Sequence, residues 1–312
     1  MKGPLFYSKI LLFGEYGIIK DSKGLSIPYN FYNGALKVDE NPGEEARRSN
    51  ESLQRFTAYL AKLQAENPSL VQFDLDALKA DVEEGMYFDS SIPQGYGVGS
   101  SGALVAAIYD KYAVDKITVL ENLTREKLLK LKNIFGEMES FFHGKSSGLD
   151  PLNSYLSIPI LINSKDNIEP AGIPSQTQNG KGAVFLLDSG SVGETAPMVS
   201  IFMENMKQEP FRRIIKDQFI KHTDACVDDF LKGDVKSLFG NIKKLSHVVL
   251  DNFKPMIPAQ FHKLWQKGIE TNEYYLKLCG SGGGGYILGF TEDIDKARKA
   301  LKDYRLEVVY NF

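Results

Sequence analysis

The sequence predicts a protein of mixed helices and strands that is divided into two domains. A chain of 312 residues is long enough for two domains, or one large one, and for a substantial buried core. As far as residue 190, short apolar strands are interspersed with long amphipathic helices, and beyond it helical patterns dominate. We therefore expect one domain over residues 1–190 and a second over residues 191–312.

In the first domain, local spacing and turn residues define the elements. Apolar runs predict strands, which cover residues 8–13, 34–38, 86–92 and 183–188. Apolar residues at helical spacing predict helices, which cover residues 44–66, 101–113 and 124–142. Thr124 is a suitable N-cap for the third of these helices. The polar stretch 163–182, rich in Gly, Pro, Asn and Gln, predicts a surface loop.

In the second domain, four helical patterns come first. They lie near residues 197–208, 211–232, 234–251 and 258–269. Two short strands then flank a glycine run. A helix near 293–303 and a strand over 306–310 follow.

The composition excludes several functional classes. A formal net charge of −3 gives no general attraction to nucleic acid or anionic lipid. No stretch approaches 18 apolar residues, and the apolar run at 10–13 is too short for a signal peptide, so we expect no membrane span and a cytosolic protein. Cys226 and Cys279 lie far apart without a C-x-x-C partner, which indicates a reduced compartment and no thiolate metal site.

The most informative segment is residues 93–103, P-Q-G-Y-G-V-G-S-S-G-A, where alternating glycines lead into an apolar helix. Glycine lets successive backbone N–H groups turn inward without a Cβ in the way, so this loop can form a concave cradle for an anion. The following helix directs its free amides and positive end to the same point. We expect a phosphate site, with the Ser101 hydroxyl available to a phosphate-bound metal. The alternative is an ordinary strand-to-helix turn.

A second glycine run, G-S-G-G-G-G at 280–285, lies between two apolar segments. A flexible linker would have polar flanks, so this run indicates close approach of the backbone to another group. The alternative is a strained turn between strands that holds no ligand.

Residues 139–150, E-S-F-F-H-G-K-S-S-G-L-D, supply two carboxylates. Glu139 lies one turn before the end of a helix, and a Ser-Ser-Gly turn brings Asp150 back towards that end. One carboxylate can hold Mg²⁺ while the other accepts or orients a hydroxyl proton. Because Mg²⁺ takes few protein ligands, Ser101 and Glu139 form an adequate set. The alternative is a solvated helix residue and an N-cap.

Lys9 precedes the apolar run of the first strand. Beside Asp150 it would lower the pKa of a substrate hydroxyl and neutralise charge as a phosphoryl group moves. The alternative is an exposed residue at a strand edge. His143 and His247 are interpreted as helix-face residues with structural partners.

Taken in this order, these segments resemble the motifs of the GHMP kinase superfamily. Residues 9–15 look like its first motif, residues 93–103 its second and residues 278–286 its third, so the resemblance covers nearly the whole chain. Within the superfamily, E-x-x-x-H-G-x-x-S-G-x-D at 139–150 and K-L-C-G-S-G-G-G-G at 277–285 are most similar to strings of the mevalonate kinases.

The resemblance implies an α+β fold, with a ribosomal S5 domain 2-like N-terminal domain and a ferredoxin-like C-terminal domain. It implies that Asp150 and Lys9 are catalytic and that Ser101 and Glu139 hold Mg²⁺. The implied ATP-binding residues are Gly95, Tyr96, Gly97, Val98, Gly99, Ser100 and Ser101. The implied substrate-binding residues are Lys9, Glu15, Tyr16, Asp150, Gly282 and Gly283.

The chain departs from the mevalonate kinase pattern where the substrate is held. Tyr16 stands where a His is usual, and the expected His-Gly pair is absent. In the second motif, Gly102 stands where Ala is commoner. Phosphomevalonate kinases often carry the Glu-Tyr form, but their substrate should call for more cations, for which Lys20 and Lys145 are the candidates.

The resemblance implies phosphorylation of the primary hydroxyl of mevalonate by ATP with Mg²⁺. The alternatives are a phosphomevalonate kinase or another GHMP kinase, a non-catalytic nucleotide-binding protein, and a diphosphomevalonate decarboxylase. The expected partner is a small-molecule substrate, mevalonate or a similar metabolite. Neither nucleic acid nor a membrane is expected, and a homodimer stays open.

Overall fold

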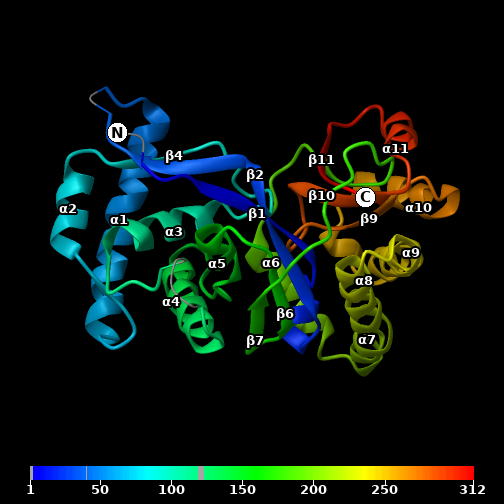
Figure 1. Cartoon of the computed structure of the whole chain (residues 1–312), viewed down its shortest axis with the longest axis horizontal. Coiled ribbons are helices and arrows are strands. Elements are labelled where there is room, and N and C mark those ends of the chain that lie inside the picture. The colour runs from blue at the N-terminus through cyan, green and yellow to red at the C-terminus, as the bar shows by residue number, and fades with distance from the viewer. Residues whose placement is uncertain (1–2, 40, 119–122) are drawn as a thin grey trace. The chain divides into compact units, whose positions relative to one another are not determined.

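The computed structural model describes residues 3–39, 41–118 and 123–312 (Figure 1). Their backbone forms two compact units. The first unit comprises the described residues within 1–9, 28–94 and 99–158, and the second those within 10–27, 95–98 and 159–312. Both units mix helices with strands, as an α+β chain should. The division predicted at residue 190 follows chain order and stays a prediction.

The first unit is built around one buried helix. Its helices are α1 (Glu44–Glu66), α2 (Leu75–Glu83), α3 (Ser100–Tyr112), α4 (Arg125–His143) and α5 (Leu149–Leu156). Its short strands are β3 (Gln72–Phe73), β4 (Tyr87–Ser90) and β5 (Ala113–Val114). Helix α3 is buried from Gly102 to Tyr109, as expected of a helix that is apolar on all sides. It contacts α4 and α5 (Figure 1).

Two long strands, β1 (Phe6–Phe13) and β2 (Gly24–Lys37), contribute residues to both units. They belong to a sheet of strand order β1-β2-β6-β7, in which β4 also pairs with β2. The pairing of β4 involves residues 34–37 of β2 and lies in the first unit. The pairing of β6 (Ile160–Ser164) involves residues 24–26 and lies in the second.

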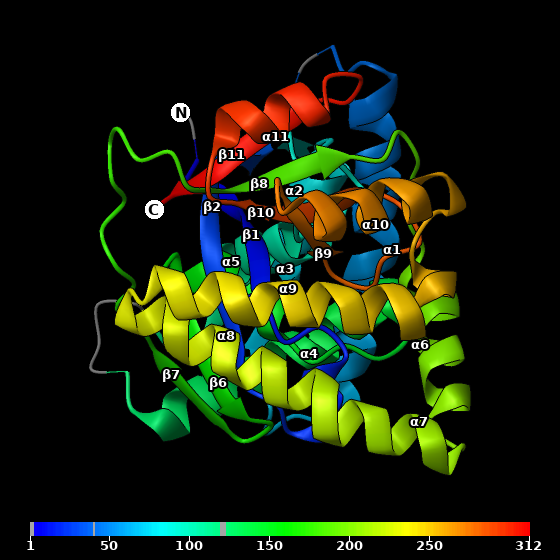
Figure 2. The same cartoon turned by 90° about the vertical axis from the view of Figure 1, so that its right-hand side faces the viewer.

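The second unit contains an antiparallel sheet of order β11-β8-β10-β9. Its strands are β8 (Ala183–Asp188), β9 (Tyr275–Leu278), β10 (Tyr286–Thr291) and β11 (Leu306–Asn311). Its helices are α6 (Thr195–Asn205), α7 (Glu209–Ile214), α8 (Lys221–Lys232), α9 (Val235–Asn252), α10 (His262–Thr271) and α11 (Ile294–Ala300). Figure 2 shows α8 and α9 side by side, and α9 contacts β9 and β10. Strands β8, β9 and β10 of this sheet are almost completely buried.

Most predicted elements are confirmed, and α1 and β8 have the predicted bounds. The predicted helix 211–232 consists of α7, a π-helical turn at Ile215–Ile220 and α8. The predicted loop 163–182 is wrong in its first part, because β7 (Asn167–Pro170) pairs with β6. Buried Ile160, Ile162 and Ile168 give this hairpin an apolar side that the polar composition concealed.

Other elements are longer than the sequence predicts or were not predicted at all. Strand β2 begins at Gly24 and not at residue 34, and α2 and α5 were not predicted.

In the described part of the chain, no helix is both long and apolar enough to cross a bilayer.

Candidate active site

An ion pair in the first unit joins β1 to α5. The Lys9 Nζ lies 2.8 Å from Asp150 Oδ1. The Lys9 side chain is only 4% exposed, whereas that of Asp150 is 39% exposed. The ammonium therefore neutralises one side of a carboxylate whose exposed part can accept a hydrogen bond from a ligand. Asp150 also lies in the first turn of α5, where the helix dipole favours a negative charge.

A second polar cluster in the same unit surrounds Glu139 of α4. Ser101 Oγ donates to Glu139 Oε1 at 2.8 Å, and Ser146 Oγ donates to Glu139 Oε2. The Nε2 of His143 lies 3.0 Å from Ser101 Oγ. Burial, and to a smaller extent the nearby Asp150 charge, raise the pKa of the Glu139 carboxyl. The hydrogen bonds from the two serines and the charge of Lys9 lower it, but they do not cancel the rise. The surroundings of Glu139 thus favour a cation.

Close packing of α3 on α5 brings the two clusters together. A Cβ on Gly102 would lie 2.8 Å from the backbone carbon of Asp150 and 2.8 Å from the nitrogen of Pro151. An alanine therefore cannot occupy this position unless the backbone of α5 shifts. This contact gives a physical reason for the glycine where the second motif usually has alanine. Without a Cβ at Gly102, the first turns of α3 and α5, which carry Ser101 and Asp150, can pack closely against each other.

In the second unit, residues 95–98 of the loop pack against the third glycine motif. The Tyr286 N–H donates to the Tyr96 carbonyl at 3.3 Å, and the Tyr96 and Tyr286 rings lie 4.9 Å apart. A Cβ on Gly97 would come within 2.6 Å of the Cys279 carbonyl oxygen. Residues of the second and third motifs are therefore in direct contact within this unit. Val98 is buried.

The remaining loop residues, Gly99 to Ser101, lie in the first unit. Gly99 takes a left-handed conformation with φ of 84° and precedes α3 at its N-cap position. Because glycine has no side chain to cap the helix, the first-turn N–H groups of α3 receive no hydrogen bond from it. Such groups are suited to an anion.

Two predicted substrate-binding residues are buried in the second unit. Glu15 Oε1 lies 2.6 Å from the Lys277 Nζ, and the Tyr16 hydroxyl donates to the Ser281 carbonyl at 2.6 Å. Gly283 uses its N–H within the protein, as a donor to the Met256 carbonyl at 2.6 Å. Whether any of these residues contacts a substrate stays a prediction.

Three residues of these clusters were not among the predicted site residues. Ser146 belongs to the Ser-Ser-Gly turn, where its hydroxyl could have been expected near Glu139. His143 was interpreted as a structural residue, yet it lies one helical turn after Glu139 and faces Ser101. Lys277 gave a weak signal, a lysine inside the apolar strand that leads to the glycine run.

The donor set of the first unit fits a magnesium ion. No group of three His, Cys, Asp or Glu side chains suited to a metal occurs in residues 3–39, 41–118 and 123–312. Magnesium does not need such a group, since it keeps several waters or phosphate oxygens and takes one or two carboxylates. Ser101 and Glu139 offer adjacent oxygen atoms. With Glu139 and Asp150 both ionised, their two negative charges would exceed the single positive charge of Lys9.

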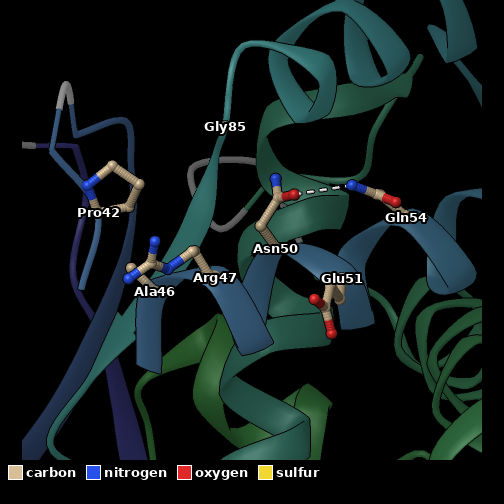
Figure 3. A pocket seen from close by; sticks show the side chains of 7 residues that line it. All are labelled: Pro42, Ala46, Arg47, Asn50, Glu51, Gln54 and Gly85. Carbon is tan, nitrogen blue, oxygen red and sulfur yellow. Dashed lines mark hydrogen bonds between the residues drawn. The ribbon is translucent and has the colours of Figure 1, made fainter. Parts of the chain in front are cut away.

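A pocket on the first unit lies at the start of α1 and includes none of the predicted site residues (Figure 3). Its lining consists of Pro42, Ala46, Arg47, Asn50, Glu51, Gln54 and Gly85. The Asn50 amide donates to the carbonyls of Val82 and Met86 and accepts from Gln54. Asn50 thus ties α1 to the end of α2 and to the segment that follows it, which is a structural role.

The comparisons with known proteins agree with these motifs. Residues 60–157 match the family model for the GHMP kinases N terminal domain. This range contains Ser101, Glu139 and Asp150. The chain has the fold of a GHMP kinase. No curated protein sequence matches it.

Solved structures extend this likeness over the whole chain. L. major mevalonate kinase in complex with R-mevalonate has a TM-score of 0.65 and 18% identity, over 100% of this chain and 99% of that one. Mevalonate kinase from Methanococcus jannaschii has a TM-score of 0.58 and 17% identity, over 99% and 98%. Streptococcus pneumoniae phosphomevalonate kinase in complex with phosphomevalonate and AMPPNP has a TM-score of 0.63 and 12% identity, over 99% and 100%. The resemblance inferred from the motifs, to GHMP kinases and to mevalonate kinases among them, is confirmed.

Proposed function

We propose that this chain is an ATP- and magnesium-dependent kinase that phosphorylates the primary hydroxyl of mevalonate. The observation that supports it most strongly is the Lys9–Asp150 ion pair, which shares its unit with the Ser101–Glu139 pair. A half-exposed carboxylate, a buried ammonium and two oxygen donors for a cation are the groups that phosphoryl transfer needs.

In this proposal, Asp150 accepts a hydrogen bond from the substrate hydroxyl and orients its oxygen towards the phosphoryl group. Lys9 holds the Asp150 carboxylate in place and offsets negative charge as the hydroxyl loses its proton. Because the Lys9 side chain is almost fully buried, its charge is screened by little water and acts strongly at short range.

The nucleotide would lie at the N-terminus of α3. Ser101 and Glu139 would hold Mg²⁺, which neutralises phosphate charge when bound. Ser146 and His143 restrain these two ligands, through hydrogen bonds to Glu139 and a 3.0 Å contact to Ser101. The free amides of the α3 first turn would bind phosphate oxygens.

The choice of mevalonate is the finer part of the proposal. It is supported by the two mevalonate kinase strings at 139–150 and 277–285 and by the likeness of the fold to mevalonate kinases. Phosphomevalonate is the second candidate, since Tyr16 departs from the mevalonate kinase pattern and the S. pneumoniae enzyme has a similar fold.

A coupled assay of ADP release tests the proposal. Mevalonate, phosphomevalonate, diphosphomevalonate, homoserine and galactose are compared at equal concentration, with ATP and Mg²⁺ present. We expect mevalonate to give the highest kcat/KM. ADP release no faster than with ATP alone for every substrate would indicate a non-catalytic nucleotide-binding protein, and release of carbon dioxide would indicate a decarboxylase.

A further inference from the structure

The turn that follows β1 is held tightly against the strand that leads into the third glycine motif. Glu15 lies in this turn, and its carboxylate pairs with Lys277 of β9. Both side chains are almost completely buried, at 4% and 0% exposed. The Lys277 ammonium also donates to the Leu278 carbonyl at 2.9 Å and lies 5.8 Å from the centre of the Phe13 ring. All of these groups belong to the second unit.

Tyr16 makes the second connection between the same two segments. Its backbone has φ of 60° and ψ of −42°, a conformation that residues other than glycine rarely adopt. Its hydroxyl donates to the Ser281 carbonyl, and its ring packs against Phe202 and Phe253 at centroid distances of 4.8 and 5.6 Å. Burial raises the pKa of the Tyr16 hydroxyl, which therefore stays a donor. The surrounding contacts hold a strained residue in place.

The glycine run is also fixed from its other side. The N–H of Gly283 donates to the Met256 carbonyl, and the N–H of Gly285 donates to the Ser191 carbonyl at 2.6 Å. A Cβ on Gly285 would lie 2.5 Å from the Tyr96 Cα. The run therefore lies between the turn at 14–16 and the loop at 95–98, and its path depends on both.

We infer that Glu15 and Tyr16 are positioning residues, which act on the reaction by fixing the glycine run 280–285 through Lys277 and Ser281. They do not bind the substrate themselves. A buried ion pair contributes little net stability compared with apolar packing, but it strongly disfavours any arrangement that separates its charges. The consequence for turnover rests on the proposed function. The fixing of the glycine run by Glu15 and Tyr16 does not depend on that function.

Two sets of variants test this inference. Glu15→Gln and Lys277→Met each leave one buried polar partner without its counterpart, and the double variant removes the charge of both. Tyr16→Phe removes one hydroxyl and keeps the ring. Tyr310→Phe is its matched control. Tyr310 lies on β11, at the other edge of the sheet from β9, and its hydroxyl donates to the Pro174 carbonyl at 2.7 Å.

The first measurement is amide hydrogen exchange of the peptide covering residues 276–287, under conditions where every variant is folded. We expect faster exchange there in Tyr16→Phe and in both single charge variants, but not in Tyr310→Phe. The second is steady-state kinetics with mevalonate and ATP. We expect kcat/KM to fall about 30-fold in each single charge variant, to return to within about 5-fold in the double variant, and to fall about 3- to 10-fold in Tyr16→Phe.

Two results would overturn the inference. If the double variant is as impaired as Glu15→Gln, the Glu15 carboxylate acts on a ligand directly. If exchange of 276–287 in Tyr16→Phe equals that in Tyr310→Phe, Tyr16 does not position the run. A wild-type protein without activity on any substrate would refute the proposed function alone, and the exchange comparison would still decide the positioning role.

Discussion

Two ion pairs involve β1 and the turn that follows it, through Lys9 in the strand and Glu15 in the turn. They differ chiefly in their access to water. Lys9–Asp150 pairs a buried ammonium with a carboxylate that is 39% exposed. Lys277–Glu15 pairs two side chains that are 0% and 4% exposed. The chemical groups are the same, but only the first pair offers part of a carboxylate to a ligand.

The comparison indicates which pair can take part in a reaction. An exposed carboxylate can exchange water for a substrate hydroxyl at small cost, whereas a sealed pair would first have to open. We therefore assign the chemistry to Asp150 and a positioning role to Glu15. Variants of the residues in and around these two pairs test this contrast.

Asp150→Asn should have the largest effect. The amide keeps the shape of the side chain but cannot accept a proton, so we expect kcat to fall by about 10³-fold or more with little change in ATP affinity. Steady-state turnover at saturating mevalonate and ATP, and a separate ATP-binding titration, measure the two quantities.

The matched control is Asp110→Asn, which breaks another Lys–Asp pair of the same unit, Asp110 with Lys116 at 2.9 Å. That variant should keep the wild-type kcat. Near-full turnover of Asp150→Asn would show that the assigned role is wrong.

Lys277→Met should reduce stability more than Lys9→Met does. Removing one partner of a sealed pair leaves a buried charge and costs about 3–5 kcal/mol, whereas the half-exposed Asp150 can be hydrated, at a cost of about 1 kcal/mol. Urea unfolding of the two variants measures the free energies. Equal losses would mean that the difference in burial has no energetic consequence.

Ser101→Ala should mainly raise the magnesium requirement. Glu139 would keep Ser146 as a donor but lose Ser101, and one oxygen ligand of the ion would be missing. We expect the Mg²⁺ concentration for half-maximal ADP release to rise about 10-fold, since a hydroxyl contact contributes about 1–1.5 kcal/mol. An unchanged Mg²⁺ dependence would remove Ser101 from the ligand set.

The sequence predicted the site around Ser101, Glu139 and Asp150 better than the Glu15–Lys277 pair, because the residues of that site carry local signals. Glu139 and Asp150 lie in one short string, and Gly99 and Ser101 in another, so spacing and chemistry indicated a shared site. The pairing of Glu15 with Lys277 joins segments from opposite ends of the chain, and no local pattern specifies it.

The fold shows the same division between local and distant causes. Helix α1 and strand β8 follow from their own residues. Helix α2 also had a usable signal, since the Asp74 side chain caps it by accepting from the Ala77 N–H. Helix α5 has only eight residues and contains Pro151, so its periodicity is too short to detect, and packing on α3 stabilises it.

Gly102→Ala should have the smallest effect of the four, and the most local one. In an open helix this change is stabilising, by about 0.5–1 kcal/mol. At Gly102 the new methyl group would meet the backbone of Asp150 and Pro151, so α5 must move and Asp150 with it. We expect kcat to fall about 3- to 10-fold, because small displacements of a catalytic group reduce its alignment with the substrate.

Gly240→Ala in α9 is the control, since a Cβ there has nothing within 4 Å. It should raise the unfolding free energy and leave kcat unchanged. If Gly102→Ala also raised the unfolding free energy and left kcat unchanged, the close contact of α3 with α5 would not set the position of Asp150. The exposure of the Asp150 carboxylate to a ligand would then depend on its ion pair with Lys9 alone.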